Sequence, residues 1–342
     1  MAKLTVVISQ GQSAQPARRR LEEELVTALL FEPGVEVTVI PHLYDLAPNG
    51  TGMLCLQSVP GDLIVLAWLF PRAAHWTLDR NGIRGRMGVS LLAEGEASDE
   101  DAPENQEGSN DGDKPRVLDS RPLPPRTIHC LDLRTKQEVS AYVAEVRRIR
   151  DEAAVQTVSI TGPLGILARS APAPVVVAPV ASSEEPVARK VEEQAARRWY
   201  PVIDYSRCTN CMECIDFCLF GVYGVDRADT ILVEQPDNCR KGCPACSRVC
   251  PENAIIFPQH KAPAIAGSAD GEAGGLKIDL SKLFGAPDAL DVAVLERDVE
   301  LVAVGRGAVG KSVGIPQRQP ARTQGPRDEL DDLIDELDRL SL

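Results

Sequence analysis

Hydrophobic and polar positions alternate with two different periods along the first 160 residues. Apolar and β-branched runs predict strands, at 4–8, 35–40, 62–70, 85–92 and 127–133. Segments with apolar residues every three or four positions predict helices, at 16–31, 73–79 and 137–154. Because strands and helices alternate, the sequence predicts an α/β domain whose mostly parallel sheet is covered on both faces.

Composition divides the rest of the chain into further segments. The α/β domain spans 1–160, is expected to be Rossmann- or flavodoxin-like, and carries an insertion at 95–120 whose acidic composition is typical of a disordered loop. A Pro- and Ala-rich linker (163–186) and a short charged helix (187–198) lead to a cysteine-rich domain (199–262). After it come a flexible joint (263–275), a helical extension (276–304), a basic Pro-rich tether (305–326) and an acidic amphipathic helix (327–342).

Eight of the ten cysteines are concentrated in two runs of similar spacing. The first run contains Cys208, Cys211, Cys214 and Cys218, and the second contains Cys239, Cys243, Cys246 and Cys250. The last three cysteines recur 32 residues later and the first recurs 31 residues later, which indicates an internal repeat with one inserted residue. Three closely spaced thiolates can bind three of the four irons of a cube-shaped iron–sulfur cluster. The fourth cysteine of each run lies too far along the chain to complete the same cluster, and it fits a second one.

With its Cys250-Pro251-Glu-Asn-Ala254-Ile255 ending, the segment 200–260 resembles the bacterial-type two-[4Fe–4S], or dicluster, ferredoxin family. The resemblance implies a small α+β fold with one hairpin at 222–234 and another that pairs the strands around Val202 and Ile256. It also implies two [4Fe–4S] clusters close enough for electron transfer. Their implied ligands are Cys208, Cys211, Cys214 and Cys250 for the first, and Cys239, Cys243, Cys246 and Cys218 for the second.

Two positions depart from this family pattern. Three residues separate Cys239 from Cys243, where two are usual, and Leu219 stands where a proline normally follows the last cysteine of the first run. Both changes alter hydrogen bonds to sulfur and therefore reduction potentials. Two zinc sites of four thiolates each are an alternative, although zinc ribbons usually pair two distant Cys-x-x-Cys knuckles. A disulfide framework is disfavoured in a cytoplasmic chain.

Other motifs carry less weight. Residues 305–312 match the phosphate-loop pattern, but Pro316 follows soon after and the preceding segment predicts a helix, so we interpret the match as chance. The Ser and Gly residues at 9–13 could bind an anion or a flavin phosphate, although an ordinary strand–helix turn explains them. Cys55 and Cys130 lie outside the two runs, and Cys130 is predicted to be buried. The four histidines show no ligand spacing.

Charge and hydropathy limit the classes of partner. With a net charge of −13 the chain lacks the basic face expected of a nucleic-acid binder. No run reaches the ~20 apolar residues that span a bilayer, and the N-terminus lacks the long apolar core of a secretory signal, so we expect a cytoplasmic protein without a membrane span. The apolar stripe of 327–342 suits docking to a partner, self-association or packing against its own chain.

Three functions fit these observations. We expect an electron carrier, or the electron-transfer subunit of an oxidoreductase, that exchanges electrons with donor and acceptor proteins. An enzyme is less expected because the α/β domain shows no convincing catalytic set. One alternative is an oxidoreductase whose α/β domain binds a flavin or a nucleotide while the clusters relay electrons to it. The other is a redox-responsive assembly or interaction protein.

Overall fold

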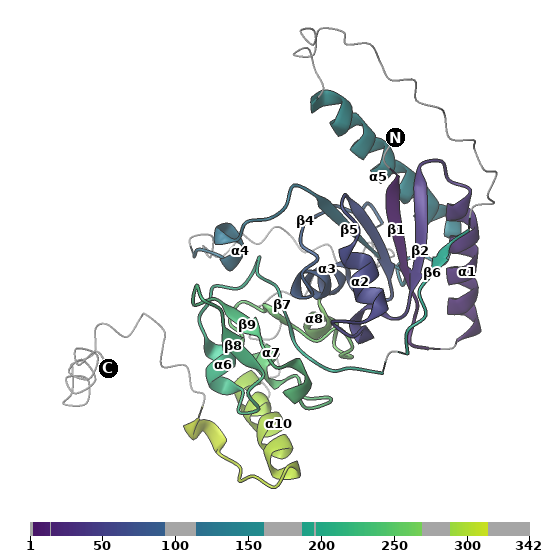
Figure 1. Cartoon of the computed structure of the whole chain (residues 1–342). Coiled ribbons are helices and arrows are strands. Elements are labelled where there is room, and N and C mark those ends of the chain that lie inside the picture. The colour runs from purple at the N-terminus through teal and green to yellow at the C-terminus, as the bar shows by residue number, and fades with distance from the viewer. Residues whose placement is uncertain are drawn as a thin grey trace, which may run out of the picture.

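The structure is a computed structural model that describes residues 3–13, 15–92, 114–160, 187–194, 196–268 and 288–313. Its described residues form an α/β domain and a smaller cysteine-rich unit, which consists of residues 199–268 and the helix that follows them (Figure 1). The acidic run of 94–113, the predicted linker at 163–186 and the predicted helix at 327–342 lie outside the described residues, as does the predicted tether beyond residue 313.

A parallel sheet of six strands forms the centre of the α/β domain. Its strands follow the order β4 (Arg86–Met87), β5 (Thr127–Asp132), β3 (Leu63–Ala67), β1 (Leu4–Ser9), β2 (Val35–Ile40) and β6 (Arg189–Lys190). The chain order reverses at β1, which pairs with β2 on one side and with β3 on the other. β3 is buried along its whole length, as its continuous apolar sequence predicts for a central parallel strand.

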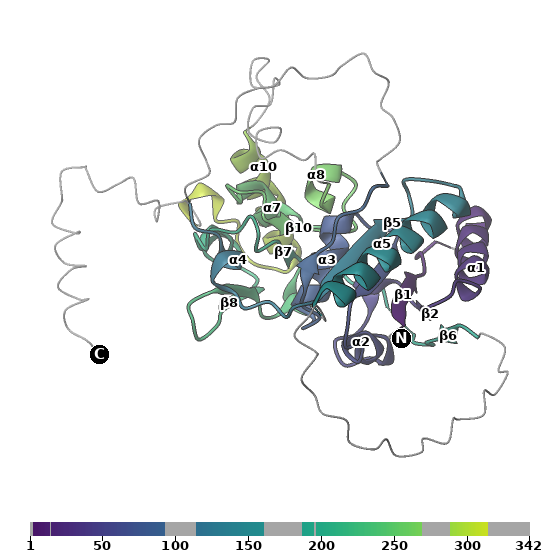
Figure 2. The same cartoon turned by 90° about the horizontal axis from the view of Figure 1, so that it is seen from above.

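Helices cover both faces of this sheet. On one face lie α1 (Pro16–Leu30) and α5 (Val139–Ile160), and on the other lie α2 (Thr51–Gln57) and α3 (Pro71–Arg80) (Figure 2). Helix α1 begins with Pro16. Proline is tolerated in the first turn of a helix because backbone N–H groups at that position make no hydrogen bond within the helix. The apolar residues Leu21, Leu25 and Leu29 recur every four positions and are buried against the sheet.

The hydrophobic core of the α/β domain continues through helix α3 into the cysteine-rich unit. Its apolar side chains belong to the same buried cluster as Tyr200, Val202 and Ile256. At this boundary the rings of Tyr44 and Tyr200 are stacked, with centroids 4.2 Å apart. The Tyr44 hydroxyl accepts a hydrogen bond from the Tyr200 amide at 2.6 Å, and the Tyr200 hydroxyl donates to the Tyr44 carbonyl at 2.9 Å. The two units therefore share a continuous interior.

The described residues of the cysteine-rich unit form two small antiparallel pairs of strands and four α-helices. The strand pairs are β7 (Val202–Ile203) with β10 (Ile255–Ile256) and β8 (Tyr223–Val225) with β9 (Ile231–Val233), at the positions that the sequence predicts. Its helices are α6 (Glu213–Phe217), α7 (Ala245–Val249), α8 (Pro263–Ala266) and α10 (Ala289–Ala303). Helix α10 packs against α7 and ends before Gly305, whose φ of 77° suits the predicted stop.

The charged helix predicted at 187–198 is wrong. The described residues of this segment are extended, and β6 adds a short strand to the edge of the sheet beside β2. The Val191 amide donates to the Val39 carbonyl at 2.9 Å, which continues the ladder by one residue. Hydrogen bonding to the backbone of β2 at the sheet edge therefore outweighs the helix propensity of the side chains in this segment.

Three predicted boundaries also differ from the structure. The strand predicted at 85–92 contains only the two residues of β4. Residues 114–120, predicted as part of the acidic insertion, include the short helix α4 (Val117–Ser120) and contact the cysteine-rich unit. The start of the predicted flexible joint is ordered, because α8 buries Ile265. The helix α2 has no counterpart among the sequence predictions.

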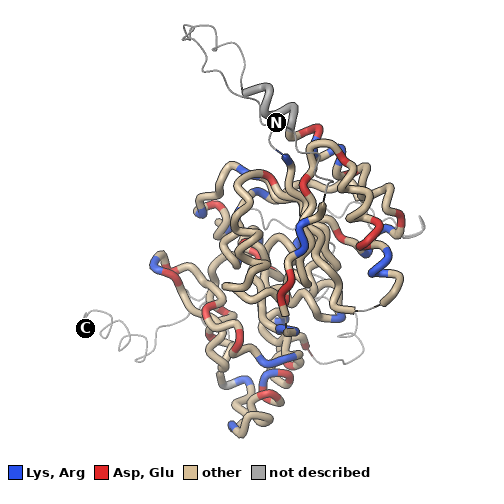
Figure 3. The backbone as a smooth tube through the Cα atoms, turned by 45° about the vertical axis from the view of Figure 1, so that its right-hand side comes forward, with Lys and Arg blue, Asp and Glu red and all other residues tan. Residues whose placement is uncertain are grey.

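Acidic and basic residues are interspersed along the backbone of both units (Figure 3). Many of them pair with each other, as Arg248 of α7 does with Glu296 of α10 at 2.9 Å. Within the described ranges no helix is long and apolar enough to cross a membrane.

Candidate metal centre

One cavity of the cysteine-rich unit, which we call cavity A, is lined by cysteines from both runs. Its cysteines are Cys208, Cys211, Cys214 and Cys250. Apolar side chains such as Met212, Ile231 and Ile255 complete the wall, together with Thr209 and Glu252. Three of the cysteines come from the loop before α6 and its first turn, whereas Cys250 follows α7.

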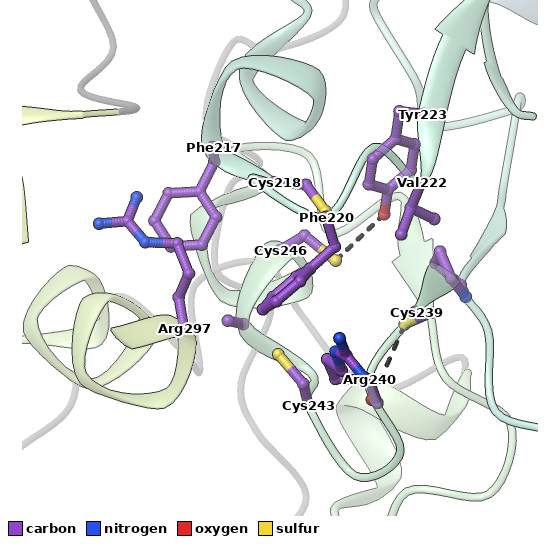
Figure 4. Close-up of a pocket in the computed structure, with 12 residues that line it drawn as sticks. Phe217, Cys218, Phe220, Val222, Tyr223, Cys239, Arg240, Cys243, Cys246 and Arg297 are labelled. Atoms are coloured by element: carbon purple, nitrogen blue, oxygen red, sulfur yellow. Dashed lines mark hydrogen bonds between the residues drawn. The ribbon is translucent and has the colours of Figure 1, made fainter. Parts of the chain in front are cut away.

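The second cavity, cavity B, has the complementary set of cysteines. Cys239, Cys243 and Cys246 come from the second run and Cys218 comes from the first run (Figure 4). The aromatic rings of Phe217, Phe220 and Tyr223 line the same cavity, and Arg297 reaches it from α10. Cavity B is therefore enclosed by aromatic side chains to a greater extent than cavity A.

Two short helices distribute the cysteines between the cavities. Cys214 lies in α6 and Cys218 is the residue that caps its end, while Cys246 and Cys250 occupy the same places on α7. At about 1.5 Å of rise per residue, each helix carries its last cysteine about 6 Å along its axis. Because α6 and α7 contact each other, that displacement brings the last cysteine of each run to the cavity of the other run.

The backbone has matching left-handed residues in the two halves. Asn210 precedes Cys211 with a φ of 60°, and Gly242 precedes Cys243 with a φ of 90°. Three residues after the last cysteine of each run, Gly221 has a φ of 68° and Asn253 a φ of 48°. Glycine and asparagine are the residues that adopt this conformation most readily. The extra residue of the second loop is thus accommodated where glycine removes the steric penalty.

Backbone amides are directed at the sulfur atoms. The Asn210 amide donates to Cys208 Sγ at 3.5 Å, and the Ala254 amide donates to Cys250 Sγ at 3.2 Å. In cavity B the Tyr223 hydroxyl donates to Cys246 Sγ at 3.1 Å. Hydrogen bonds of this kind stabilise a thiolate, and around iron–sulfur clusters they help to set the reduction potential.

Burial affects the free thiols in the opposite direction. Desolvation raises the pKa of Cys208 to about 12 and that of Cys243 to about 11, and it raises the pKa of Cys214 and Cys246 well above its ordinary value. These four thiols are therefore protonated at neutral pH in the metal-free protein. Since thiolates are the metal ligands, binding of a metal centre must release protons.

The donor chemistry of both cavities fits an iron–sulfur group. Each cavity offers four cysteine thiols, apolar walls and N–H or O–H donors to sulfur, which are the features that such clusters use. In the described parts of the chain, no three His, Cys, Asp or Glu side chains are grouped closely enough to hold a single metal ion. The four sulfurs of each set surround a cavity instead.

The other sequence candidates have structural roles in the described residues. The Gly11 amide in the turn after β1 donates to the buried Glu22 carboxylate at 2.8 Å, so a side chain of the protein occupies the place of an anion. The phosphate-loop match follows helix α10 rather than a strand, and its Lys311 pairs with Asp291. Cys130 is buried in β5, where desolvation raises its pKa to about 12, as expected for a core residue.

Sequence reasoning missed three polar side chains close to the cysteines. They are Tyr223 of β8, Arg297 of α10 and Arg72 of α3. Arg297 is only 1% exposed and lies over the Phe217 ring, 4.6 Å from its centroid. Two signals in the sequence could have pointed to them: Tyr223 lies inside an expected hairpin, and Arg297 lies in a largely apolar helix. Neither has a fixed spacing from the cysteines that would single it out.

Comparison with known proteins supports the resemblance read from the cysteine pattern. A stretch of 66 residues, 19% of the chain, is 52% identical to an uncharacterised ferredoxin of Methanocaldococcus jannaschii. This stretch is 44% of that protein, so the chain spans less than half the length of the curated relative that it matches. No protein-family model matches the chain, and no solved structure matches it significantly. The chain therefore contains a segment that belongs to the ferredoxin family.

Proposed function

We propose that the protein transfers electrons by means of two [4Fe–4S] clusters, one in each cysteine-lined cavity. The proposed ligands are Cys208, Cys211, Cys214 and Cys250 in cavity A, and Cys239, Cys243, Cys246 and Cys218 in cavity B. The observation that carries the proposal is the exchange of the last cysteine between the two halves, which gives each cavity four sulfurs. The ferredoxin-family segment agrees with this assignment.

The clusters supply one-electron redox chemistry, and the residues of this chain set the conditions for it. The eight thiolates would hold the irons, and the Ala254 amide and the Tyr223 hydroxyl donate to the sulfurs of Cys250 and Cys246. Apolar and aromatic side chains form much of both walls, and Cys208, Cys214 and Cys246 are buried behind them. Because α6 and α7 are in contact, the two cavities are neighbours, and electrons can pass between them without leaving the protein.

The α/β domain and the partners enter the proposal in a supporting role. The α/β domain packs against the cysteine-rich unit and orients it toward donor and acceptor proteins, and residues 327–342 are a candidate for docking to one of them. We propose a cytoplasmic electron carrier or an electron-transfer subunit of an oxidoreductase. Binding of a flavin in the turn after β1 receives less support, because the nearby cavity of about 200 Å³ is smaller than the ~300–1,000 Å³ of most ligand pockets.

Anaerobic reconstitution with iron and sulfide tests the proposal. The expected product contains about eight irons and eight sulfides per chain. After reduction, its EPR spectrum should show two centres that interact magnetically. A Cys55→Ala variant serves as the control, because Cys55 lies in α2 away from both cavities and its loss should not alter the iron content. Stable binding of two zinc ions per chain without sulfide would contradict the proposal.

A further inference from the structure

Arg72 connects the α/β domain to the wall of cavity A. It lies in the first turn of α3 and is only 6% exposed, although it carries a charged guanidinium. Its Nε donates to the carboxylate of Asp204, which is 1% exposed, and its Nη2 donates to the Asn253 carbonyl. Both partners belong to the cysteine-rich unit. A buried ion pair of this kind is costly to desolvate. Arg72 is near enough to Cys250 to interact with it electrostatically.

The bond to Asn253 continues to a ligand sulfur. The Asn253 carbonyl and the Ala254 amide belong to the same peptide group, and the Ala254 amide donates to Cys250 Sγ at 3.2 Å. A guanidinium that donates to the oxygen of a peptide polarises its N–H and strengthens the hydrogen bond which that N–H makes. Arg72 is thus linked to the sulfur of Cys250 through one peptide plane.

Asp204 links the same ion pair to the other end of cavity A. Its backbone carbonyl accepts a hydrogen bond from the Cys208 amide at 2.9 Å, and its amide donates to the Ala254 carbonyl at 2.8 Å. Among the described residues, the Nη1 atom of Arg72 is buried without a hydrogen-bond acceptor. An orphaned donor on a buried cation is costly unless an anionic group lies nearby. Arg72 interacts electrostatically with Cys250, so a thiolate-ligated cluster in cavity A would bring negative charge near this guanidinium.

We propose that Arg72 makes the α/β domain a determinant of the reduction potential of the cluster in cavity A. This inference rests on the proposed function. Reduction adds one electron, and so one negative charge, to an already anionic cluster; no bond forms or breaks and no proton is transferred. A buried cation stabilises the more negative, reduced form, and so does a strengthened N–H···S bond. Both effects raise the potential.

The effect of Arg72 is confined to cavity A. Cavity B has a separate, exposed link of the same kind, in which Arg306 Nη1 donates to the Leu219 carbonyl at 2.8 Å and the Phe220 amide of that peptide interacts with Cys218. The buried arginine beside cavity B, Arg297, uses its Nη atoms to bind the Val313 and Gly310 carbonyls and does not reach a peptide that donates to sulfur. Cavity B has its own donor to sulfur, the Tyr223 hydroxyl. Removing the charge of Arg72 should therefore lower one of the two potentials and leave the other unchanged.

EPR-monitored redox titration of the full chain with both clusters loaded tests this inference. In Arg72→Met, one midpoint potential is expected to fall and the other to stay within error of the wild-type value. Asp204→Asn removes the negative partner, leaves Arg72 charged and keeps an acceptor oxygen, so it should shift the same potential upward. Opposite shifts from the two members of one ion pair are not expected from a purely structural role.

Two further variants make the assignment unambiguous. Tyr223→Phe should lower only the potential that Arg72→Met leaves unchanged. If Arg72→Met does not retain two clusters, Arg72→Lys keeps the charge but loses the forked geometry, and a smaller fall in the same potential is expected. Unchanged potentials in the Arg72 variants would overturn the inference, and so would a fall in Asp204→Asn. A wild-type protein that lacks two one-electron centres would instead refute the proposed function.

Discussion

Cys214 and Cys218 lie at the two ends of the five-residue helix α6, yet they line different cavities. One helical turn is enough to separate them, because α6 contacts α7 and each helix reaches across to the other half. The proposed function depends on this division more than on any single contact. It also determines what removal of each cysteine should do.

Cys218→Ala should damage the centre of the second run rather than that of its own run. The variant keeps all four sulfurs of cavity A and leaves three in cavity B. We expect iron content to fall toward half after gel filtration, and the EPR spectrum of the reduced protein to lose its magnetic interaction. Cys130→Ala is a matched control outside both cavities. A Cys218→Ala protein that keeps two interacting centres would contradict the ligand exchange.

Tyr44→Phe should weaken the contact between the two units. The substitution removes the hydroxyl that accepts from the Tyr200 amide and donates to the Tyr200 carbonyl, and it leaves that buried amide without its partner. We expect a loss of about 2–3 kcal/mol in the free energy of unfolding. Urea denaturation followed by circular dichroism measures it. Tyr142→Phe alters a buried tyrosine inside the α/β domain and should leave the contact between the two units unchanged.

Glu22→Ala should destabilise the turn after β1. The Glu22 carboxylate accepts from the Gly11 amide and from Trp68 Nε1, each at 2.8 Å, and from Arg19 Nη1 at 2.9 Å, so its removal takes the acceptor from three donors. A loss of ~3 kcal/mol in unfolding free energy is expected, and Glu22→Gln should lose less because an amide oxygen still accepts. Thermal unfolding compares the three proteins. Equal stability of Glu22→Ala and wild type would show that the turn does not depend on this carboxylate.

Acid should destabilise the protein through buried histidines. Desolvation by burial lowers the pKa of His42 and of His75 below 6.5 in the folded state. Below pH 6.5 the unfolded chain therefore binds protons that the folded chain does not, and stability falls as pH decreases toward the folded pKa values. Unfolding free energies at pH 7.5 and pH 5.5 measure this loss. In His75→Gln the difference between the two pH values should be smaller, and an unchanged difference would argue against a contribution from His75.

The strands and helices that follow a clear hydrophobic period could be predicted from the sequence. The parallel strands β1, β2, β3 and β5 and the helices α1, α3 and α5 lie where their patterns indicate, because each buries one defined face. The prediction of a helix at 187–198 was wrong for a physical reason. Its helix-forming composition competes with pairing to β2, and the energy of that pairing depends on a strand about 150 residues earlier.

The cysteines could also be found in the sequence, since short spacings encode local geometry. Arg72 could not. Its partners are 132 and 181 residues away, and no local pattern distinguishes an arginine that enters a second unit from one on a solvated face. The same holds for Tyr44, which meets Tyr200 at a separation of 156 residues. Contacts of this kind follow from how the two units pack, which periodicity does not encode.

The common interior of the two units has a practical consequence for any attempt to isolate the ferredoxin-family segment. An excised fragment that begins near Trp199 would present the apolar faces of Tyr200, Val202 and Ile256 to water, because α3 no longer covers them. Such a fragment should associate with itself or require detergent, and titrations performed on it would describe an altered molecule. Cluster potentials of this protein are therefore best measured on a chain that includes the N-terminal sheet.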